Sequence, residues 1–168
     1  MPTQDELLAA FFESTEAQLK SGVSVIQHCV TQLSLEQVWW RPSEDMNSIA
    51  NLLIHLEGNV RQWMICGLNA QADLRNRQSE FDDRSNRPVD ELLRDLAQTV
   101  NEAIQCIRSQ TADDLVRRRL VQEWDETGFS AIAGSTTHFV GHVQEIVHMT
   151  RVLLGDKYQF RFVPKDQA

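Results

Sequence analysis

The sequence lacks the features that would place the protein in a membrane or on an export route. No apolar run approaches the roughly 18 consecutive residues that suggest a membrane span. Residues 1–6 contain neither a basic nor an apolar segment, so they do not resemble a signal peptide. The three cysteines, Cys29, Cys66 and Cys106, are far apart and form no CxxC pair, which argues against a zinc ribbon or a thioredoxin-type motif. We therefore expect a cytoplasmic protein with reduced, buried or half-buried thiols.

Positive charge is also scarce. The formal net charge is -8 and the isoelectric point is near 5.0. Binding to nucleic acid depends largely on Lys and Arg side chains that neutralise phosphates, so we expect no nucleic-acid partner. The one arginine run, residues 117–119, is short and is followed by acidic residues. It is interpreted as a solvated segment.

Apolar residues instead recur with the period of an α-helix in four long segments, within a length of 168 residues that fits a single domain, residues 1–168. The predicted helices cover about residues 4–33, 48–69, 88–107 and a final one that starts between 130 and 136 and ends near 154. Thr3 with Glu6 forms a capping box, Asn47 or Ser48 caps the second helix, and Gly155 ends the last. The pattern predicts an all-α fold, a four-helix bundle with long connecting loops.

Two connections between these helices are unusually long. Residues 70–87 are polar and rich in charges of both signs, which predicts a surface excursion without clear structure, and such loops are often functional or mobile. Residues 115–129 show no helical period and favour a short hairpin or an extended arm. The four tryptophans of the chain are interpreted as packing residues, with a binding groove as the alternative.

Three histidines are the candidate functional residues. His138 and His142 are four residues apart, so in a helix they lie one above the other on the same face and can supply two corners of a metal site. His55 lies in the second predicted helix among apolar residues and is expected to point inward. If the two helices pack together, three imidazoles converge and leave further coordination positions open, as in a catalytic metal site. The alternatives are a hydrogen-bonded core histidine at position 55 and a polar helix edge at 138 and 142.

Glu145 lies one turn beyond His142. It is a candidate metal ligand, an acceptor that orients His142, or a catalytic base, and the alternative is an ordinary surface glutamate. His148 is turned about 120° away from His142 by the helix period, and His28 falls off the apolar stripe of its helix, so both are expected at the surface.

The segments 35–42 and 47–59, together with the final-helix motif His138-Phe-Val-Gly-His142-Val-Gln-Glu145-Ile, resemble the DinB-like (YfiT-like) metalloenzyme superfamily. The resemblance spans nearly the whole chain and is weakest in the first helix. It implies an up-down-down-up bundle, often dimeric, in which His55, His138 and His142 hold a divalent metal, most often nickel or zinc. Glu145 stands where many members have glutamine.

The same resemblance implies transfer of low-molecular-weight thiols as one activity of such proteins, in detoxification or the stress response. On this basis we expect a metal-dependent thiol S-transferase that acts on a small-molecule substrate. Arg41, Arg75 or Arg77 is a candidate to bind carboxylates of the thiol. The alternatives are a metal-dependent hydrolase with Glu145 as base, and a non-enzymatic bundle that binds a small ligand.

Overall fold

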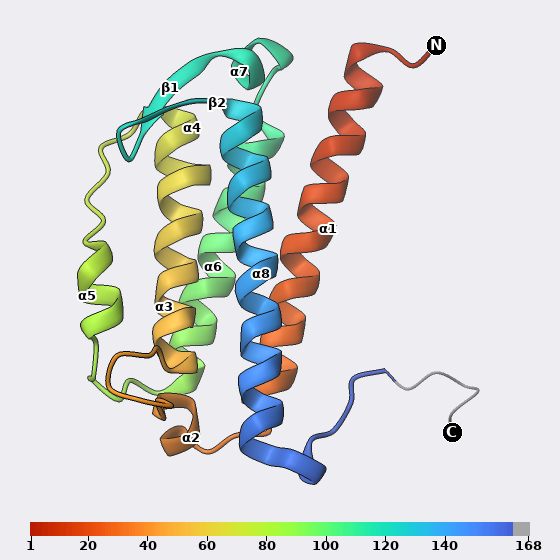
Figure 1. The fold of residues 1–168 in the computed structure, drawn as a ribbon. Helices are drawn as coiled ribbons and strands as arrows, with labels where there is room; N and C mark the ends of the chain where they lie inside the picture. Colours follow the sequence, from red (N-terminus) through yellow and green to blue (C-terminus); the bar gives the residue numbers. More distant parts are fainter. Residues whose placement is uncertain (163–168) are drawn as a thin grey trace.

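The computed structural model describes residues 1–162. Its four long helical segments stand side by side (Figure 1). They are α1 (Gln4–Val30), the composite of α3 (Ile49–Val60), η1 (Arg61–Cys66) and α4 (Gly67–Asn69), α6 (Val89–Arg108) and α8 (Gly128–Leu154). The short elements are α2 (Leu35–Trp39), α5 (Arg77–Asp82), α7 (Ala112–Val116), β1 (Arg118–Val121), β2 (Trp124–Thr127) and the 3-10 turn η2 (Gly155–Lys157).

The helices form the predicted up-down-down-up bundle. In Figure 1 α1 and α8 run downward, whereas the α3–α4 segment and α6 run upward. Helix α8 packs against both α1 and α3, and α6 packs against both α3 and α1, which closes a four-sided core. The all-α fold class is therefore confirmed, and the contact of α8 with α3 joins the two helices that carry the candidate histidines.

Side-chain caps fix where these helices begin. The Thr3 side chain accepts a hydrogen bond from the amide of Glu6, and Ser48 caps α3 by accepting one from the amide of Asn51. At the other end of α8, Gly155 has a φ of 53°, which glycine adopts without a steric penalty. These three boundaries agree with the sequence prediction.

Three details differ from the prediction. Residues 70–87 are not structureless, because they contain α5, which packs on α3 and is capped by the Asn76 side chain. Helix α8 begins at Gly128, before the predicted start, because the Thr127 side chain accepts a hydrogen bond from the amide of Ser130. The arginine run is not wholly solvated, since Arg119 donates to the carbonyl oxygens of Leu68 (2.6 Å) and Asp114 (2.5 Å).

The hairpin expected in residues 115–129 is present. Strands β1 and β2 pair antiparallel, with Arg119 opposite Glu126 and Val121 opposite Trp124. The hairpin lies across the end of the bundle where α4 ends and α8 begins (Figure 1). Val121 is buried there, so this hairpin is packed onto the helices and forms part of the wall beside them.

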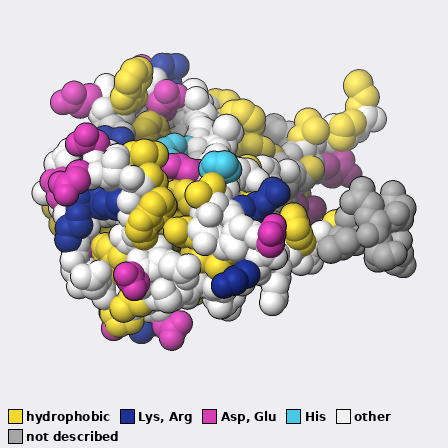
Figure 2. All heavy atoms as spheres, turned by 60° about the horizontal axis from the view of Figure 1, so that its bottom comes forward, with side chains coloured by type: hydrophobic (Ala, Val, Ile, Leu, Met, Phe, Trp, Pro, Cys, Tyr) yellow, Lys and Arg dark blue, Asp and Glu magenta, His cyan; other side chains and the backbone are white. Residues whose placement is uncertain are grey.

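In the described part of the chain, no helix is both long enough and apolar enough to cross a membrane. On the face shown in Figure 2, Lys and Arg side chains lie in small separate groups among acidic and apolar ones. That face therefore offers no continuous basic surface for a polyanion.

Gly22 allows α1 to approach α8 closely. A Cβ atom at Gly22 would lie 2.5 Å from Cε1 of Phe139, a fully buried ring that cannot move without repacking the core. We therefore expect Gly22→Ala to lower the free energy of unfolding by about 1–3 kcal/mol in urea titrations, as overpacking does. Gly134→Ala is the matched control, because a Cβ there meets nothing within 4 Å, and an equal loss in both variants would contradict this account.

Candidate metal centre

The side chains of His55, His138 and His142 converge at the contact between α3 and α8. Each offers one ring nitrogen, and the three nitrogens lie within 4.8 Å of one another. The Nε2 atoms of His55 and His138 are 2.9 Å apart, and the ring centroids of His138 and His142 are 4.5 Å apart. These histidines, which come from two helices, could hold a metal ion.

The spacing of the nitrogens fits that role. Two imidazole nitrogens bonded to one ion at about 2.0–2.1 Å lie roughly 2.9–3.4 Å apart, depending on whether the geometry is octahedral or tetrahedral. The distance between His55 and His138 falls within this range. Three neutral nitrogen donors suit zinc and nickel, and they leave one or more coordination positions for water or substrate.

A buried carboxylate contacts the His55 ring at the nitrogen that faces away from the other two histidines. Oε2 of Glu80 lies 2.9 Å from Nδ1 of His55, and both side chains are almost fully buried. Because a carboxylate can only accept, Nδ1–H of His55 donates to it, which leaves Nε2 without a proton and directed at His138. Carboxylates bound in this way to metal-ligating histidines fix the ring and increase its basicity.

Glu80 is itself fixed by Arg75. The guanidinium donates from Nε to Oε1 (2.6 Å) and from Nη2 to Oε2 (2.8 Å), and its Nη1 donates to Oε1 of Gln62 (2.7 Å). This two-pronged geometry neutralises the buried carboxylate and restricts its rotation. The ring of Phe81 lies against His55 with the centroids 4.9 Å apart. Residues of the 70–87 segment therefore build one wall of the histidine cluster.

His142 has a comparable but more exposed partner. Oε2 of Glu145 is 2.7 Å from Nδ1 of His142, and the Glu145 side chain is 45% exposed. As with His55, the bond engages Nδ1 and leaves Nε2 available. Glu145 thus lies beside the cluster, in contact with one of its rings. His148 is exposed, as expected.

The electrostatics favour the neutral form of His55 and His138. Burial, followed by the nearby imidazoles of His142 and His55, lowers the pKa of His138 to about 4. Burial also lowers the pKa of His55, although the hydrogen bond to Glu80 opposes that change. For Glu80 burial alone would raise the pKa, but hydrogen bonds from Arg75 and His55 lower it below its ordinary value. At neutral pH His55 and His138 are therefore held as neutral rings, the form that binds metals.

A cavity of about 480 Å³ opens beside the cluster. Its wall includes His55 and His138 together with Trp63, and a pair of hydrogen-bonded side chains, Ser135 and Asn59 (2.8 Å), borders it. Of the three arginines considered from sequence, Arg77 lines this cavity, and no carboxylate within residues 1–162 forms an ion pair with its side chain. Arg41 is used structurally, because it donates to Asn51 and to the backbone oxygens of Met46 and Phe81.

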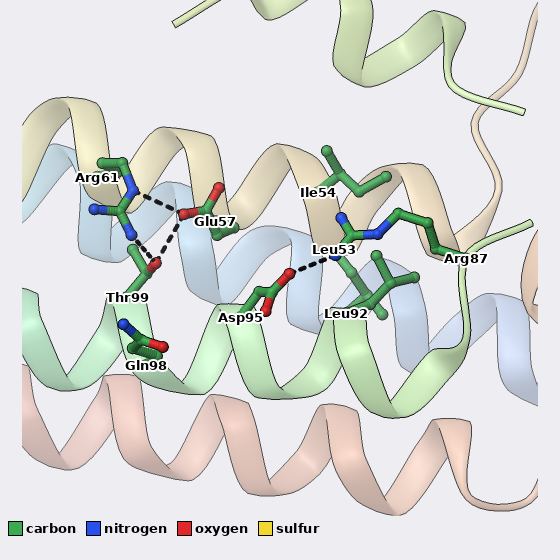
Figure 3. A pocket seen from close by; sticks show the side chains of 9 residues that line it. All are labelled: Leu53, Ile54, Glu57, Arg61, Arg87, Leu92, Asp95, Gln98 and Thr99. Atoms are coloured by element: carbon green, nitrogen blue, oxygen red, sulfur yellow. Dashed lines mark hydrogen bonds and ion pairs between the residues drawn. The ribbon is translucent and has the colours of Figure 1, made fainter. Parts of the chain in front are cut away.

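A second cavity, of about 200 Å³ between α3 and α6, has a different character (Figure 3). Arg61 donates to Glu57 (2.8 Å) and to Thr99 (2.6 Å), and Arg87 donates to Asp95 (2.5 Å). These charged side chains satisfy one another, and the contacts of Arg61 and Glu57 with Thr99 join the α3–α4 segment to α6. The histidine cluster, by contrast, presents nitrogens that converge on one another.

Gly58 makes room for the pair of Glu80 and Arg75. A Cβ atom at Gly58 would lie 2.2 Å from Oε1 of Glu80 and 2.9 Å from Nε of Arg75. Because these atoms are at the far ends of flexible side chains, they can move away, so we expect Gly58→Ala to leave the protein folded. The displaced carboxylate no longer orients His55, so zinc affinity is expected to fall by about tenfold in competition titrations.

Gly141→Ala is the control for this substitution. Its Cβ would meet nothing within 4 Å although it adjoins His142. Equal zinc affinity in Gly58→Ala and the wild type would contradict the role given to Glu80.

Comparisons with known proteins agree with this fold. The model of a family described as a protein of unknown function, DUF1572, matches residues 6–167. The solved structure of a DinB-like protein, YjoA from Bacillus subtilis, is similar with a TM-score of 0.65 at 14% sequence identity, over 89% of this chain and 96% of that chain. A search of curated proteins gave no match. The chain therefore belongs to the DUF1572 family, and it has the fold of a DinB-like protein.

Proposed function

We propose that the protein is a divalent-metal-dependent enzyme in which His55, His138 and His142 hold the metal, nickel or zinc. The observation that carries this proposal is the convergence of three imidazoles beside an open cavity. Three protein ligands and an accessible position characterise catalytic sites, whereas structural zinc sites have four protein ligands.

Within this class we propose transfer of a low-molecular-weight thiol to a small electrophile. A bound divalent cation supplies the charge that keeps a thiol as its nucleophilic thiolate at neutral pH. The chain's own contribution is to hold the imidazoles of His55 and His142 in place through Glu80 and Glu145 and to offer Trp63 as an apolar surface for the electrophile. In the reaction, sulfur forms a bond to the electrophilic carbon, the leaving group departs with its electron pair, and the thiol proton goes to solvent.

The test is conjugation of a thiol with 1-chloro-2,4-dinitrobenzene, which releases chloride. Zinc-loaded or nickel-loaded wild type is expected to accelerate the reaction, and His142→Ala to lose the acceleration because the thiolate is no longer stabilised. Turnover that is unchanged in His142→Ala would contradict the thiol-transfer proposal.

Glu145 distinguishes this reaction from a hydrolytic one. In the thiol-transfer proposal it orients His142, so Glu145→Gln is expected to weaken zinc binding by about tenfold while transfer persists at saturating zinc. In the alternative, metal-assisted hydrolysis, Glu145 is the base that takes a proton from water, and the same variant abolishes the hydrolysis of model esters in the absence of thiol. Initial rates of both reactions in one preparation decide between the two.

A non-enzymatic role is the remaining alternative, in which the bundle binds a small ligand without turning it over. A metal-free protein that stays folded and retains a small organic molecule would favour it.

We further propose that the protein is a homodimer and that it is located in the cytoplasm. Light scattering of the purified protein tests the oligomeric state.

A further inference from the structure

The cavity beside the histidines has walls from parts of the chain that are far apart in sequence. Trp63 comes from η1, Arg77 from α5, Glu126 from β2 and His138 from α8. Two of these residues, Arg77 and Glu126, carry opposite charges. Their environment indicates what kind of molecule the cavity accepts.

Arg77 is a cation that forms no ion pair with the part of the chain that the structure describes. Among the described residues no carboxylate oxygen lies within 4.0 Å of its guanidinium, which instead lies over the ring of Phe81, 4.7 Å from the centroid. The Phe81 ring also packs against the ring of His55. Arg77 is thus one aromatic ring away from a candidate metal ligand, and its charge contributes to the lowered pKa of His138.

Glu126 is an anion that lines the same cavity. It is half-buried, and its cross-strand neighbour is Arg119, the residue best placed to neutralise it. The Arg119 guanidinium is engaged elsewhere, on the carbonyl oxygens of Leu68 and Asp114. Within residues 1–162 the Glu126 side chain has neither an ion pair nor a hydrogen bond to another side chain.

The other charged side chains around these cavities are satisfied by one another. Arg75 is paired with Glu80, and the cavity of Figure 3 contains Arg61 with Glu57 and Arg87 with Asp95. Among the charged residues that line these two cavities, Arg77 and Glu126 therefore differ from the rest, because neither is paired with another described residue. A ligand with complementary charges gains hydrogen bonds to both without breaking an existing pair.

We propose that the cavity selects small molecules that carry both a carboxylate, which binds Arg77, and an ammonium group, which binds Glu126, while a third group reaches the metal. This inference rests on the proposed function, because it takes a metal at the three histidines as its anchor. To the proposed function it adds the charges that the substrate carries and the two residues that bind them.

Hydroxamates of matched length test the proposal without relying on thiol chemistry. The probes are propionohydroxamate (neutral), succinate monohydroxamate (carboxylate), β-alanine hydroxamate (ammonium) and aspartate β-hydroxamate (both charges). Binding is followed by the visible spectrum of the cobalt-loaded protein, since Co²⁺ accepts the same nitrogen ligands and reports a change of coordination.

Each matched charge is expected to improve the dissociation constant by on the order of tenfold over propionohydroxamate, with aspartate β-hydroxamate binding most tightly. Arg77→Gln removes the gain from the carboxylate alone, and Glu126→Gln removes the gain from the ammonium group alone. Arg94→Gln and Glu123→Gln change the net charge equally at exposed positions outside the cavity and are expected to retain both gains.

The outcomes separate the two proposals. If all four hydroxamates bind with equal affinity, or if the control variants lose the gains as well, the charge selectivity is wrong and the metal site stands. If the protein binds no cobalt, or if no hydroxamate changes the cobalt spectrum, both proposals are overturned.

Discussion

The His138→Ala variant is expected to lose its metal. Wild-type protein incubated with zinc or nickel and then desalted should retain about one equivalent per chain, whereas the variant should retain almost none. Removing a residue that merely orients a ligand costs about 10–100-fold in metal affinity, so removing a ligand itself should cost more. The fold should persist, because His138 is only half-buried and its neighbours on α8 form the core contacts.

His148→Ala is the matched control, since it removes an imidazole from the exposed side of the same helix. It should retain the wild-type equivalent of metal. Elemental analysis and circular dichroism of the three proteins at equal concentration are sufficient. Equal metal content in wild type and His138→Ala would place the metal elsewhere or make its binding nonspecific.

Glu80→Gln is expected to produce the second large effect, on stability and metal affinity together. It leaves the buried Arg75 charge without its counter-charge, which costs about 3–5 kcal/mol of unfolding free energy when a buried pair is broken. It also replaces the anion that orients His55, so zinc affinity is expected to fall by about 10–100-fold. Urea titration measures the first effect, and competition with a zinc-binding dye measures the second.

A double variant, Glu80→Gln with Arg75→Gln, separates the two roles. Removing the unpaired charge should recover much of the lost stability, because neutral side chains avoid the desolvation cost of a buried ion. Zinc affinity should remain low, because His55 still lacks its carboxylate. Recovery of affinity along with stability would show that Glu80 acts only through the fold.

The helices and the histidine pair could be predicted because both depend on local spacing. Apolar periodicity and side-chain caps set the helix boundaries, and a separation of four residues places His138 and His142 on one face. The contact of these residues with His55 required only that α3 and α8 be neighbours. The family resemblance supplied that arrangement.

Glu80 could not be found in this way. It lies in a polar segment with charges of both signs, where nothing in the pattern marks one carboxylate as buried. Its contact with His55 spans 25 residues and depends on how α5 packs against α3. The only local indication is Gly58, whose missing side chain leaves space for the carboxylate, and that reason becomes visible only in three dimensions.

Arg75 and Arg77 show the same limit. Two residues apart and chemically identical, they were equivalent candidates for binding a ligand. The packing of α5 buries one against Glu80 and leaves the other at the cavity wall. Sequence spacing does not distinguish them, because the difference depends on which carboxylate each side chain meets.

X-ray absorption at the metal edge of the zinc-loaded or nickel-loaded protein tests the central claim most directly. The account predicts nitrogen or oxygen scatterers at about 2.0–2.1 Å, with multiple scattering that fits three imidazoles. For metal bound to the His138→Ala variant under excess metal, it predicts that only two imidazoles remain as ligands. Sulfur scatterers at about 2.3 Å, or a first shell without imidazole, would contradict a three-histidine site.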